Sequence, residues 1–364
     1  MAKAKTPFDP GKFENIFQVG GITTGTIDWP QPNGGGSCRV AMVDTGSGLR
    51  FTIALDRGGD ILDASYKGCA LAYLTPNGAT PPNHAHHADL EWLSSWPGGL
   101  VTTCGPLNIG LPTPEDRHSS LHGHFSNTPA AVNAVTNPNP WQRKPEMSID
   151  LTIRDTRFFG PNIEVQRRIA CRLGESVIEI HDRVSNIGDR VIPHQYLYHV
   201  NLGHPLLDHG ARLIYGGHFD ASWDLPTPPH KPSPIRFPSY KRVPDALASH
   251  AGAGERGLII RPAATRNGKV RVGLINSKRG IGFELSFLRS QLPRLANWQH
   301  FGPRGSYVCG LEPFNGALRD DDKSPLAKRT LRPGQTVNYD LTLSALEGRA
   351  ALADLARCDA TLTK

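Results

Sequence analysis

Short runs in which hydrophobic and polar residues alternate recur along most of the chain, and this pattern is typical of β-strands with one buried face. Most of the runs end at Gly, Pro, Asn or Asp, the residues that favour turns. The chain contains 38 Gly and 31 Pro, spread over its length. The runs that we expect to form strands are Cys38–Val43, Leu49–Leu55, Ser148–Arg154, Ile163–Leu173, Val177–Val184, Val270–Ile275, Gly282–Phe287 and Thr336–Leu343.

Two of these patterns predict how elements lie relative to one another. The run Val177–Val184 follows Gly174-Glu175, so we expect it to be the second arm of a hairpin that begins at Ile163. Near the C-terminus, Leu346–Cys358 has the pattern of an amphipathic helix. Its apolar side comprises Ala351, Leu352, Leu355 and Cys358, and we expect it to pack on the outside of the sheets.

Many strands and a single clear helix predict an all-β fold, a sandwich or a barrel. The Pro-rich segments Thr75–His87 and Leu225–Val243 are too irregular to be strands. Loops of that length in a compact domain usually cap a binding cleft or cover a sheet edge. Because no repeat and no change in composition marks a boundary, we expect residues 1–364 to form one domain.

The charge and the cysteine content limit which binding partners and which cellular location are expected. Lys and Arg exceed Asp and Glu by 40 minus 33, giving a net charge of +7. The charges are dispersed and no nucleic-acid-binding motif is present, so a basic surface that favours acidic metabolites, or one without ligand meaning, is expected instead. The six cysteines have no C-x-x-C pair or zinc-finger spacing. Without a signal peptide or an apolar run of membrane-spanning length, the cytoplasm is the expected location.

Three segments contain residue types that a plain β core does not need. The first runs from Trp96-Pro-Gly-Gly99 through Thr102–Asn108 to Leu121-His-Gly-His-Phe-Ser-Asn127. The second is Tyr198-His-Val-Asn-Leu-Gly-His-Pro205. In the third, Gly310-Leu-Glu-Pro-Phe-Asn315, a lone acid follows an apolar strand. An unpaired carboxylate near a core is costly, so the position of Glu312 favours a functional role.

These segments resemble a known family. Leu121-His122-Gly123 resembles the L-H-G signature of aldose 1-epimerases, His199 with Asn201 resembles their second histidine, and Glu312 resembles their late glutamate. A longer set of motifs is similar to the uncharacterised mutarotase-like DUF4432 group across most of the chain. That set is Arg57–Ile61, Trp96–Gly99, Thr103–Gly105, Leu121–Gly123, Ser126–Pro129 and Gly310–Pro313.

The resemblance implies a galactose mutarotase-like β-supersandwich with a sugar site in an open cleft. It further implies an aldose 1-epimerase-like enzyme that interconverts the anomers of a sugar, a sugar phosphate or a sugar acid. Glu312 would be the base, His199 the acid at the ring oxygen, and His122 a hydrogen-bonding partner or second acid. A carboxylate and an imidazole can exchange these protons near neutral pH. No cofactor and no metal is required.

Eight further residues are expected to contact the sugar: Arg57, Asp60, Trp96, Asn108, His124, Asn201, Gln299 and Asn315. Arg57 is the nearest candidate for the arginine that orients sugar hydroxyls in the family, although it could equally hold a neighbouring carboxylate. Asp60 also suits a structural turn, and Trp96 also suits a packing anchor. The family's usual second motif has asparagine four residues after histidine, whereas Asn201 follows His199 by two.

Other interpretations remain open at this point. Cys104 is more typical of a buried thiol than of a nucleophile. The tract His84-Ala-His86-His87 has the composition of a metal site, and His122 with His124 could share one face of a strand, but solvated or structural roles are more typical. A carbohydrate-binding protein without catalysis, and epimerase or lyase chemistry at carbon on the same scaffold, are the competing functions. The sequence predicts neither the sugar nor the oligomeric state.

Overall fold

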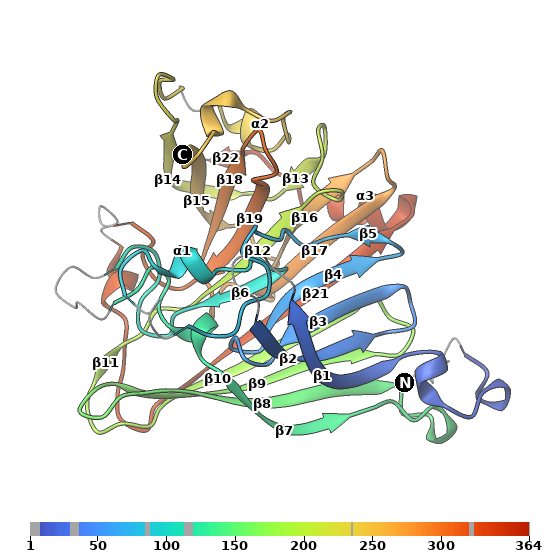
Figure 1. Ribbon diagram of the computed structural model, residues 1–364. Coiled ribbons are helices and arrows are strands. Elements are labelled where there is room, and N and C mark those ends of the chain that lie inside the picture. The colour runs from blue at the N-terminus through green and yellow to red at the C-terminus, as the bar shows by residue number, and fades with distance from the viewer. Residues whose placement is uncertain are drawn as a thin grey trace.

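The computed structural model describes residues 8–29, 36–83, 88–112, 119–233, 236–319 and 324–363. Two large sheets, mainly antiparallel, form the body of this described part (Figure 1). The 12-stranded sheet has the order β1 (Gly21–Trp29), β2 (Gly36–Asp44), β3 (Leu49–Ala54), β4 (Asp60–Tyr66), β6 (Val101–Cys104), β12 (Leu197–Gly203), β19 (Tyr307–Phe314), β18 (Arg294–Phe301), β15 (Glu255–Pro262), β14 (Gly217–Leu225) and β22 (Leu362–Thr363), and β5 (Cys69–Ala70) pairs with β4.

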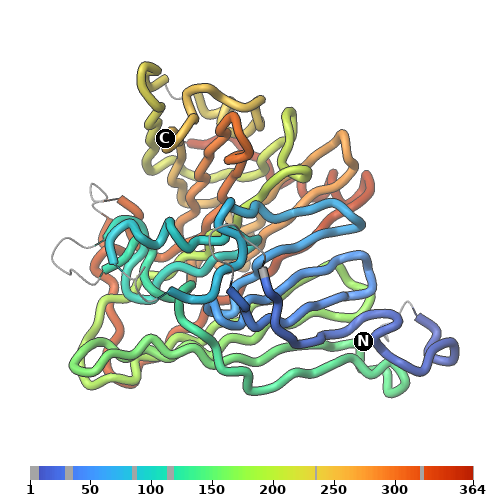
Figure 2. Tube along the Cα trace, in the orientation of Figure 1, coloured from blue at the N-terminus to red at the C-terminus, as the bar shows by residue number. Residues whose placement is uncertain are grey.

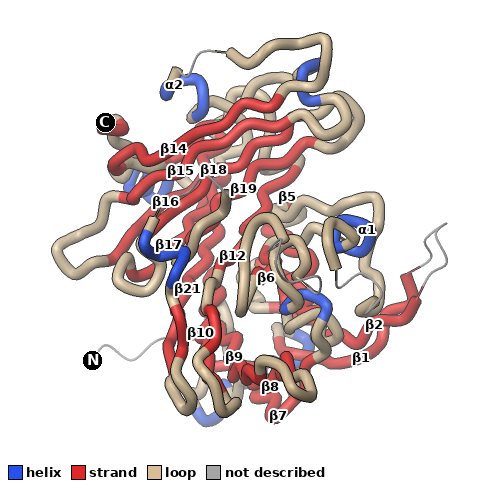
Figure 3. The backbone as a smooth tube through the Cα atoms, turned by 90° about the vertical axis from the view of Figure 1, so that its left-hand side faces the viewer, coloured by secondary structure: helices blue, strands red, loops and turns tan. Residues whose placement is uncertain are grey.

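The second sheet has 8 strands within the described residues. Its order is β13 (Arg212–Ile214), β16 (Lys269–Asn276), β17 (Ile281–Leu288), β21 (Thr336–Glu347), β10 (Val177–Asn186), β9 (Asn162–Arg172), β8 (Glu146–Thr156) and β7 (Ala130–Thr136). A small pair joins β11 (Ile192–Pro193) to β20 (Thr330–Leu331). The α-helices are α1 (Trp92–Ser95), α2 (Phe237–Tyr240) and α3 (Arg349–Ala356), and they lie outside the sheets (Figure 3).

The predicted strands are confirmed. Each of the eight expected runs coincides with a strand, except that Leu55 and Leu173 lie one residue beyond β3 and β9. β9 and β10 pair antiparallel as the predicted hairpin, with Ile180 opposite Ile169. Alternating burial along β9 and β10 shows why the sequence pattern was informative. One face of each strand packs into the core and the other meets water, which is the period-two arrangement.

The predicted C-terminal helix is present but shorter than expected. β21 continues to Glu347, which pairs with Ile281 of β17, so the helix begins only at Arg349. Leu352 and Leu355 of α3 join a cluster with Ile275 of β16 at the 8-stranded sheet. The prediction that this helix packs outside the sheets is therefore confirmed, whereas its start was predicted three residues too early.

The main core lies between the two large sheets. Its largest cluster combines Phe51 and Leu311 of the 12-stranded sheet with Ile149, Ile180 and Leu343 of the 8-stranded sheet. The first strands and the strands β14, β15 and β18 lie at opposite ends of the 12-stranded sheet, as the colours in Figure 2 show. β12 and β19 lie at its centre, where both faces are covered.

The two faces of β12 have different surroundings. Tyr198, Val200 and Leu202 belong to the main core between the sheets. Leu197 belongs to a separate cluster, and by strand alternation His199 shares its face. The segment around α1 covers this second face, because Trp96 contacts the His199 ring at 5.5 Å between centroids. No helix in the described ranges is long and apolar enough to cross a membrane.

Candidate functional site

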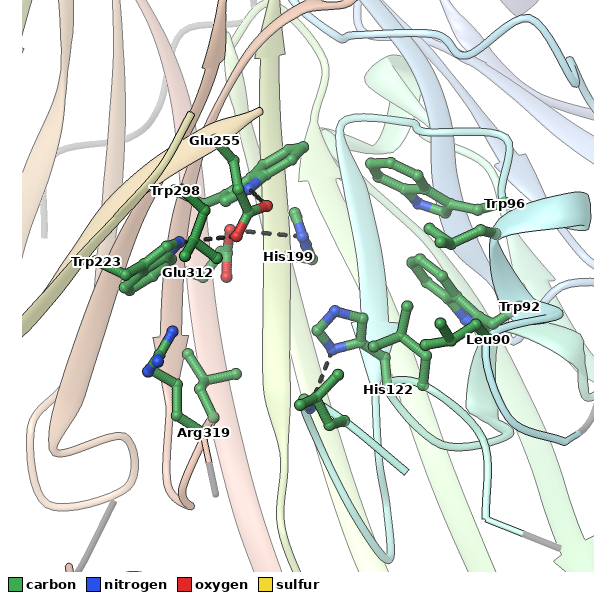
Figure 4. Close-up of a pocket in the computed structure, with 16 residues that line it drawn as sticks. Leu90, Trp92, Trp96, His122, His199, Trp223, Glu255, Trp298, Glu312 and Arg319 are labelled. Carbon is green, nitrogen blue, oxygen red and sulfur yellow. Dashed lines mark hydrogen bonds and ion pairs between the residues drawn. The ribbon is translucent and has the colours of Figure 1, made fainter. Parts of the chain in front are cut away.

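A cavity of about 610 Å³ opens on the face of the 12-stranded sheet that α1 covers (Figure 4). Strands β12, β14, β15, β18 and β19 supply one part of its wall, and the segments around α1 and before β7 supply the other. Its lining residues are Leu90, Trp92, Leu93, Trp96, Gly110, Leu111, Leu121, His122, His199, Trp223, Leu225, Glu255, Trp298, Glu312, Leu318 and Arg319. The three predicted catalytic residues are among them.

His199 and Glu312 face each other on neighbouring strands. β12 and β19 pair antiparallel with Leu197 opposite Phe314 and Val200 opposite Leu311, and this register brings His199 beside Glu312. Nε2 of His199 lies 3.4 Å from Oε1 of Glu312. Both side chains are buried, with residue exposures of 5% and 3%. Two residues that are 113 positions apart in sequence (312 minus 199) are thus adjacent because of strand pairing.

Gly310 makes room for the Glu312 carboxyl group. A Cβ atom at position 310 would lie 2.1 Å from Oε1 of Glu312, closer than any real contact. The two residues share one face of β19 because their positions differ by two. The motif Gly310-Leu-Glu312 therefore has a direct structural reason: any larger residue at 310 would displace the carboxyl group.

Burial determines the electrostatics of this pair. It raises the pKa of Glu312 well above its ordinary value, and the charge of Glu255 raises it further. Burial likewise lowers the pKa of His199 well below its ordinary value, and nearby His122 lowers it further. Oε1 of Glu312 and Nδ1 of His199 have no hydrogen-bond partner within the described residues. Buried polar atoms usually have one, so these two are available to a bound molecule.

His122 is held in one tautomer by a loop. Its backbone has φ of 60°, in the left-handed region, where it pairs with Gly110. The backbone N–H of Gly110 donates to Nδ1 of His122 over 3.2 Å, and the His122 N–H donates to the Gly110 carbonyl. Burial lowers the pKa of His122 to about 4. The ring is therefore neutral at neutral pH and carries its proton on Nε2, as a hydrogen-bond donor.

Trp92 and Trp96 form an aromatic wall beside the histidines. Their rings stack at 5.2 Å with an interplanar angle of 20°. Each indole N–H already donates inside the protein, from Trp92 to Ser126 and from Trp96 to Thr102. The two rings therefore offer apolar surface rather than hydrogen bonds to the cavity. Trp96 is anchored by Thr102, as the packing role predicts, and it also lines the cavity, where a contact with sugar stays a prediction.

Glu255 and two tryptophans form the facing wall, and the sequence analysis did not single them out. The indole N–H of Trp298 donates to Oε2 of Glu255 over 2.6 Å, and that of Trp223 donates to Oε1 over 2.8 Å. Gly257 permits this arrangement, because a Cβ there would lie 2.2 Å from the Trp223 ring. Four of the six tryptophans in the chain line the cavity, and that enrichment becomes visible only once the strands are paired.

Arg57 and Asp60 lie away from the cavity lining. The Arg57 side chain is buried, and its Nη1 donates weakly to the carbonyl oxygens of Thr80 and Pro81 at 3.4 and 3.5 Å. Asp60 accepts from the backbone N–H of Thr103 over 3.0 Å and pairs with Arg167. Of the two roles that the sequence left open for Asp60, these contacts support the structural one.

Five other predicted sugar contacts also lie outside the lining. Gln299 is on the opposite face of β18 from Trp298, where it donates to the Tyr240 carbonyl. Asn201 donates to the carbonyl of Gly99, and Asn108 to that of Ser120. The remaining two are His124, whose Nδ1 lies 3.9 Å from Asp155, and Asn315, which accepts from the Tyr196 N–H. Strand alternation accounts for Gln299, whereas Asn201 shares the face of His199 and is bound instead to backbone carbonyl groups.

The alternatives based on cysteine and metal chemistry find no support in the geometry. Burial raises the pKa of Cys104 well above its ordinary value, so the thiol is not activated as a nucleophile. His122 and His124 lie in a turn and a helical cap rather than on a strand, and their rings contact different groups. No cluster of three metal-ligating side chains occurs in the part of the chain that is described. His84–His87 lies outside that part.

Sequence comparison assigns the family directly. The model of the family "Domain of unknown function (DUF4432)" matches residues 35–345. The chain belongs to this family. No curated protein matches it. Membership confirms the resemblance that the motifs from Arg57 to Pro313 indicated.

Solved structures show the fold of this DUF4432 protein. A "putative aldose 1-epimerase" from Klebsiella pneumoniae is 21% identical with a TM-score of 0.76, over 94% of this chain and 90% of that one. A galactose mutarotase-like protein from Clostridium acetobutylicum is 13% identical with a TM-score of 0.59, over 90% and 98%. The predicted galactose mutarotase-like β fold is confirmed. At these identities the likeness establishes the fold alone.

Proposed function

We propose that this DUF4432 protein catalyses the interconversion of the anomers of a reducing sugar, with Glu312 as the base and His199 as the acid. The observation that carries this proposal is the buried carboxyl–imidazole pair, with Nε2 and Oε1 3.4 Å apart on the cavity wall. Among the described residues, neither Oε1 of Glu312 nor Nδ1 of His199 has a hydrogen-bond partner. The names of the similar structures support the same reaction class.

The proposed reaction moves two protons and breaks one bond. Glu312 takes the proton of the anomeric hydroxyl while His199 gives one to the ring oxygen, so the bond between C1 and the ring oxygen breaks and a carbonyl forms. Rotation about the bond between C1 and C2 presents the other face of the carbonyl. The two residues then return the protons in the opposite sense during ring closure. The enzyme regains its starting state, so no cofactor is consumed.

In this proposal, one proton moves between Glu312 and His199. Burial favours the neutral acid of Glu312 and the neutral imidazole of His199, so in the unliganded cavity the transferable proton is on the Glu312 carboxyl group. Transfer of that proton across the 3.4 Å gap gives the carboxylate base and the imidazolium acid without changing the total charge. Hydroxyl groups of the sugar then stabilise the ionised pair by donating to the carboxylate.

His122 and Glu255 suit the binding of the sugar around this pair. The neutral His122 ring donates from Nε2 to a sugar oxygen, because Gly110 occupies its Nδ1. Glu255 is held by Trp223 and Trp298 and accepts hydrogen bonds from sugar hydroxyls. The described lining contains two carboxyl groups and one guanidinium, that of Arg319. This balance favours a neutral sugar over a sugar phosphate or a sugar acid.

Anomer exchange measured by saturation-transfer NMR tests the proposal. Neutral aldoses are expected to exchange faster with the protein than without it, in proportion to protein concentration. The measurement must be made above the spontaneous mutarotation in water. Sugar binding with exchange no faster than that background would instead identify a carbohydrate-binding protein without catalysis.

The same experiment in heavy water separates a third class of reaction. Mutarotation exchanges only hydroxyl protons, so no deuterium enters a carbon position. Deuterium appearing at a carbon next to the carbonyl would contradict the proposal and indicate epimerase or lyase chemistry at carbon.

A further inference from the structure

The mouth of the cavity is apolar, in contrast to the polar pair inside. Leu90, Leu93, Leu111 and Leu225 line the cavity, with residue exposures of 49%, 50%, 50% and 52%. Among the described residues, five leucines are prominently exposed, and these are four of them. A single exposed leucine is ordinary, but apolar residues gathered from separate segments at one cavity indicate a binding surface.

These leucines come from three different parts of the fold. Leu90 and Leu93 lie at and before α1, Leu111 lies in the loop that also positions Gly110, and Leu225 is the last residue of β14. The α1 segment is held in place from behind: the side chain of Asn77 donates to the carbonyl oxygens of Leu93 and Trp96. The part of the apolar mouth that α1 supplies is therefore anchored.

The volume of the cavity exceeds what one sugar ring needs. At roughly 30 Å³ per water molecule, 610 Å³ corresponds to about twenty waters, whereas an aldohexose has about twelve non-hydrogen atoms. A cavity in the range of roughly 300–1,000 Å³ is typical for ligands of drug size. By volume, one sugar ring therefore fills only part of the cavity.

We propose that the natural substrate is a reducing sugar that carries an apolar aryl or alkyl group on a hydroxyl other than the anomeric one, and that the leucine mouth binds this group. A second sugar ring fits this mouth less well, because its hydroxyls would lose water against leucine side chains that cannot accept or donate hydrogen bonds. Trp92 offers the same apolar surface, since its indole N–H is bound to Ser126. This inference rests on the proposed function, because the reducing ring must occupy the polar part.

Three sets of sugars test the inference: glucose and galactose, their four mono-O-benzyl ethers at O2, O3, O4 and O6, and the disaccharide melibiose. Affinity is measured by calorimetry and by quenching of tryptophan fluorescence. Burial of the benzyl ring is expected to make at least one ether bind roughly tenfold to hundredfold more tightly than its parent sugar. Melibiose, which extends O6 with a polar group, is expected to show no such gain.

Variants of the leucines test whether the higher affinity for a benzyl ether arises at the apolar mouth of the cavity. Leu93→Asn and Leu225→Asn are expected to reduce the ratio of benzyl-ether affinity to parent affinity by at least several-fold. Val191→Asn is the matched control, because Val191 is 56% exposed and lies outside the cavity lining. No gain for any ether, an equal gain for melibiose, or an unchanged ratio in both leucine variants would overturn the inference.

The outcomes also separate this inference from the proposed function. Exchange of anomers without any benzyl gain would sustain the function and refute the apolar substrate. A benzyl gain that depends on Leu93 and Leu225, without exchange for any sugar, would refute the function while supporting a binding site for apolar sugars.

Discussion

Tyr198 and His199 are neighbours on β12, but their side chains enter two polar clusters on opposite faces of the same sheet. Tyr198 donates to Oδ2 of Asp182 between the two large sheets. Asp182 also receives two hydrogen bonds from Arg167, at 2.8 and 2.7 Å, and one from Tyr196. His199 faces the cavity, where Glu312 is its neighbour. Both clusters are buried, yet only the first is fully paired.

The two clusters differ in how completely their polar atoms are paired. Every side-chain nitrogen of Arg167 donates a hydrogen bond inside the protein, to Asp182, to Gly58 and Gly59, and to Thr103. In the cavity, Oε1 of Glu312 and Nδ1 of His199 have no hydrogen-bond partner in the described structure. An unpaired buried polar atom destabilises the fold by roughly 1–3 kcal/mol. Arg57 and Asn127 also have unpaired buried atoms, but only His199 and Glu312 of these four residues line the cavity, and this supports the proposed role of the pair.

The largest effect is expected from Glu312→Gln on the rate of anomer exchange. The amide keeps the shape of the side chain but cannot accept the proton, so the rate should fall roughly hundredfold to ten-thousandfold. The free energy of unfolding should stay the same or rise slightly, because no paired charge is lost. Saturation-transfer NMR and urea unfolding measure the two quantities. Glu179→Gln, on an exposed position of β10, is the control. Unchanged exchange with sugar still bound would remove Glu312 from the mechanism.

Asp182→Ala should mainly lower the stability of the fold, whereas Glu312→Gln should mainly lower the rate of anomer exchange. The change removes the acceptor of two Arg167 hydrogen bonds and leaves Arg167 with the longer pair to Asp60 at 3.2 Å. Breaking this buried pair should lower the free energy of unfolding by about 3–5 kcal/mol. Asp150→Ala is the matched control in the same sheet, because the Asp150–Arg168 pair is exposed, and its loss should cost about 0–1 kcal/mol. Urea unfolding measures both.

If Asp182→Ala does not fold, Asp182→Asn should show a smaller loss of stability, since the amide oxygen can still accept hydrogen bonds. Equal stability of the Asp182 and Asp150 variants would contradict the distinction between the two clusters.

A smaller effect is expected on the free energy of unfolding at low pH. It arises from one buried histidine in the cavity and one in the core. Burial lowers the pKa of His122 in the cavity and of His194 in the core to about 4. Below pH 6.5 the unfolded chain takes up these protons before the folded protein does. Stability is therefore full above pH 6.5 and falls as the pH is lowered from 6.5 towards 4, by up to roughly 3 kcal/mol for each residue.

Unfolding by urea at several pH values between 7 and 4.5 tests this expectation. His122→Gln and His194→Gln should each reduce the loss of stability on acidification. If only His194→Gln does so, the cavity solvates the charged form of His122, and the two regions differ in hydration as well as in pairing.

Much of the fold could be predicted from local patterns. Burial alternates along the whole of β9 and β10 and over residues 149–154 of β8, so their sequences alone indicated strands and a hairpin. The end of β21 could not be found in this way. Leu346 and Glu347 fit a helical pattern, but pairing with β17 keeps them in a strand.

The candidate site was predicted in part. The motifs containing His122, His199 and Glu312 singled out three lining residues, and Trp96 was a fourth. Gln299 was predicted instead of its neighbour Trp298, and a shift of one residue along a strand moves the side chain to the other face. Asp60 was predicted either to contact the sugar or to stabilise a turn. Its pairing with Arg167 of the other sheet could not be predicted from the residues around Asp60.

The sequence by itself determined the strands, the family and the catalytic candidates, because these depend on residue periodicity and on short motifs. Only the tertiary structure decided that Glu255, Trp223 and Trp298 belong together and that four leucines meet at one cavity. The physical reason is that strand register and long-range hydrogen bonds select which face each side chain occupies. The same register decided which buried polar atoms are paired, as in the cluster of Asp182, and which lack a partner among the described residues, as in Glu312.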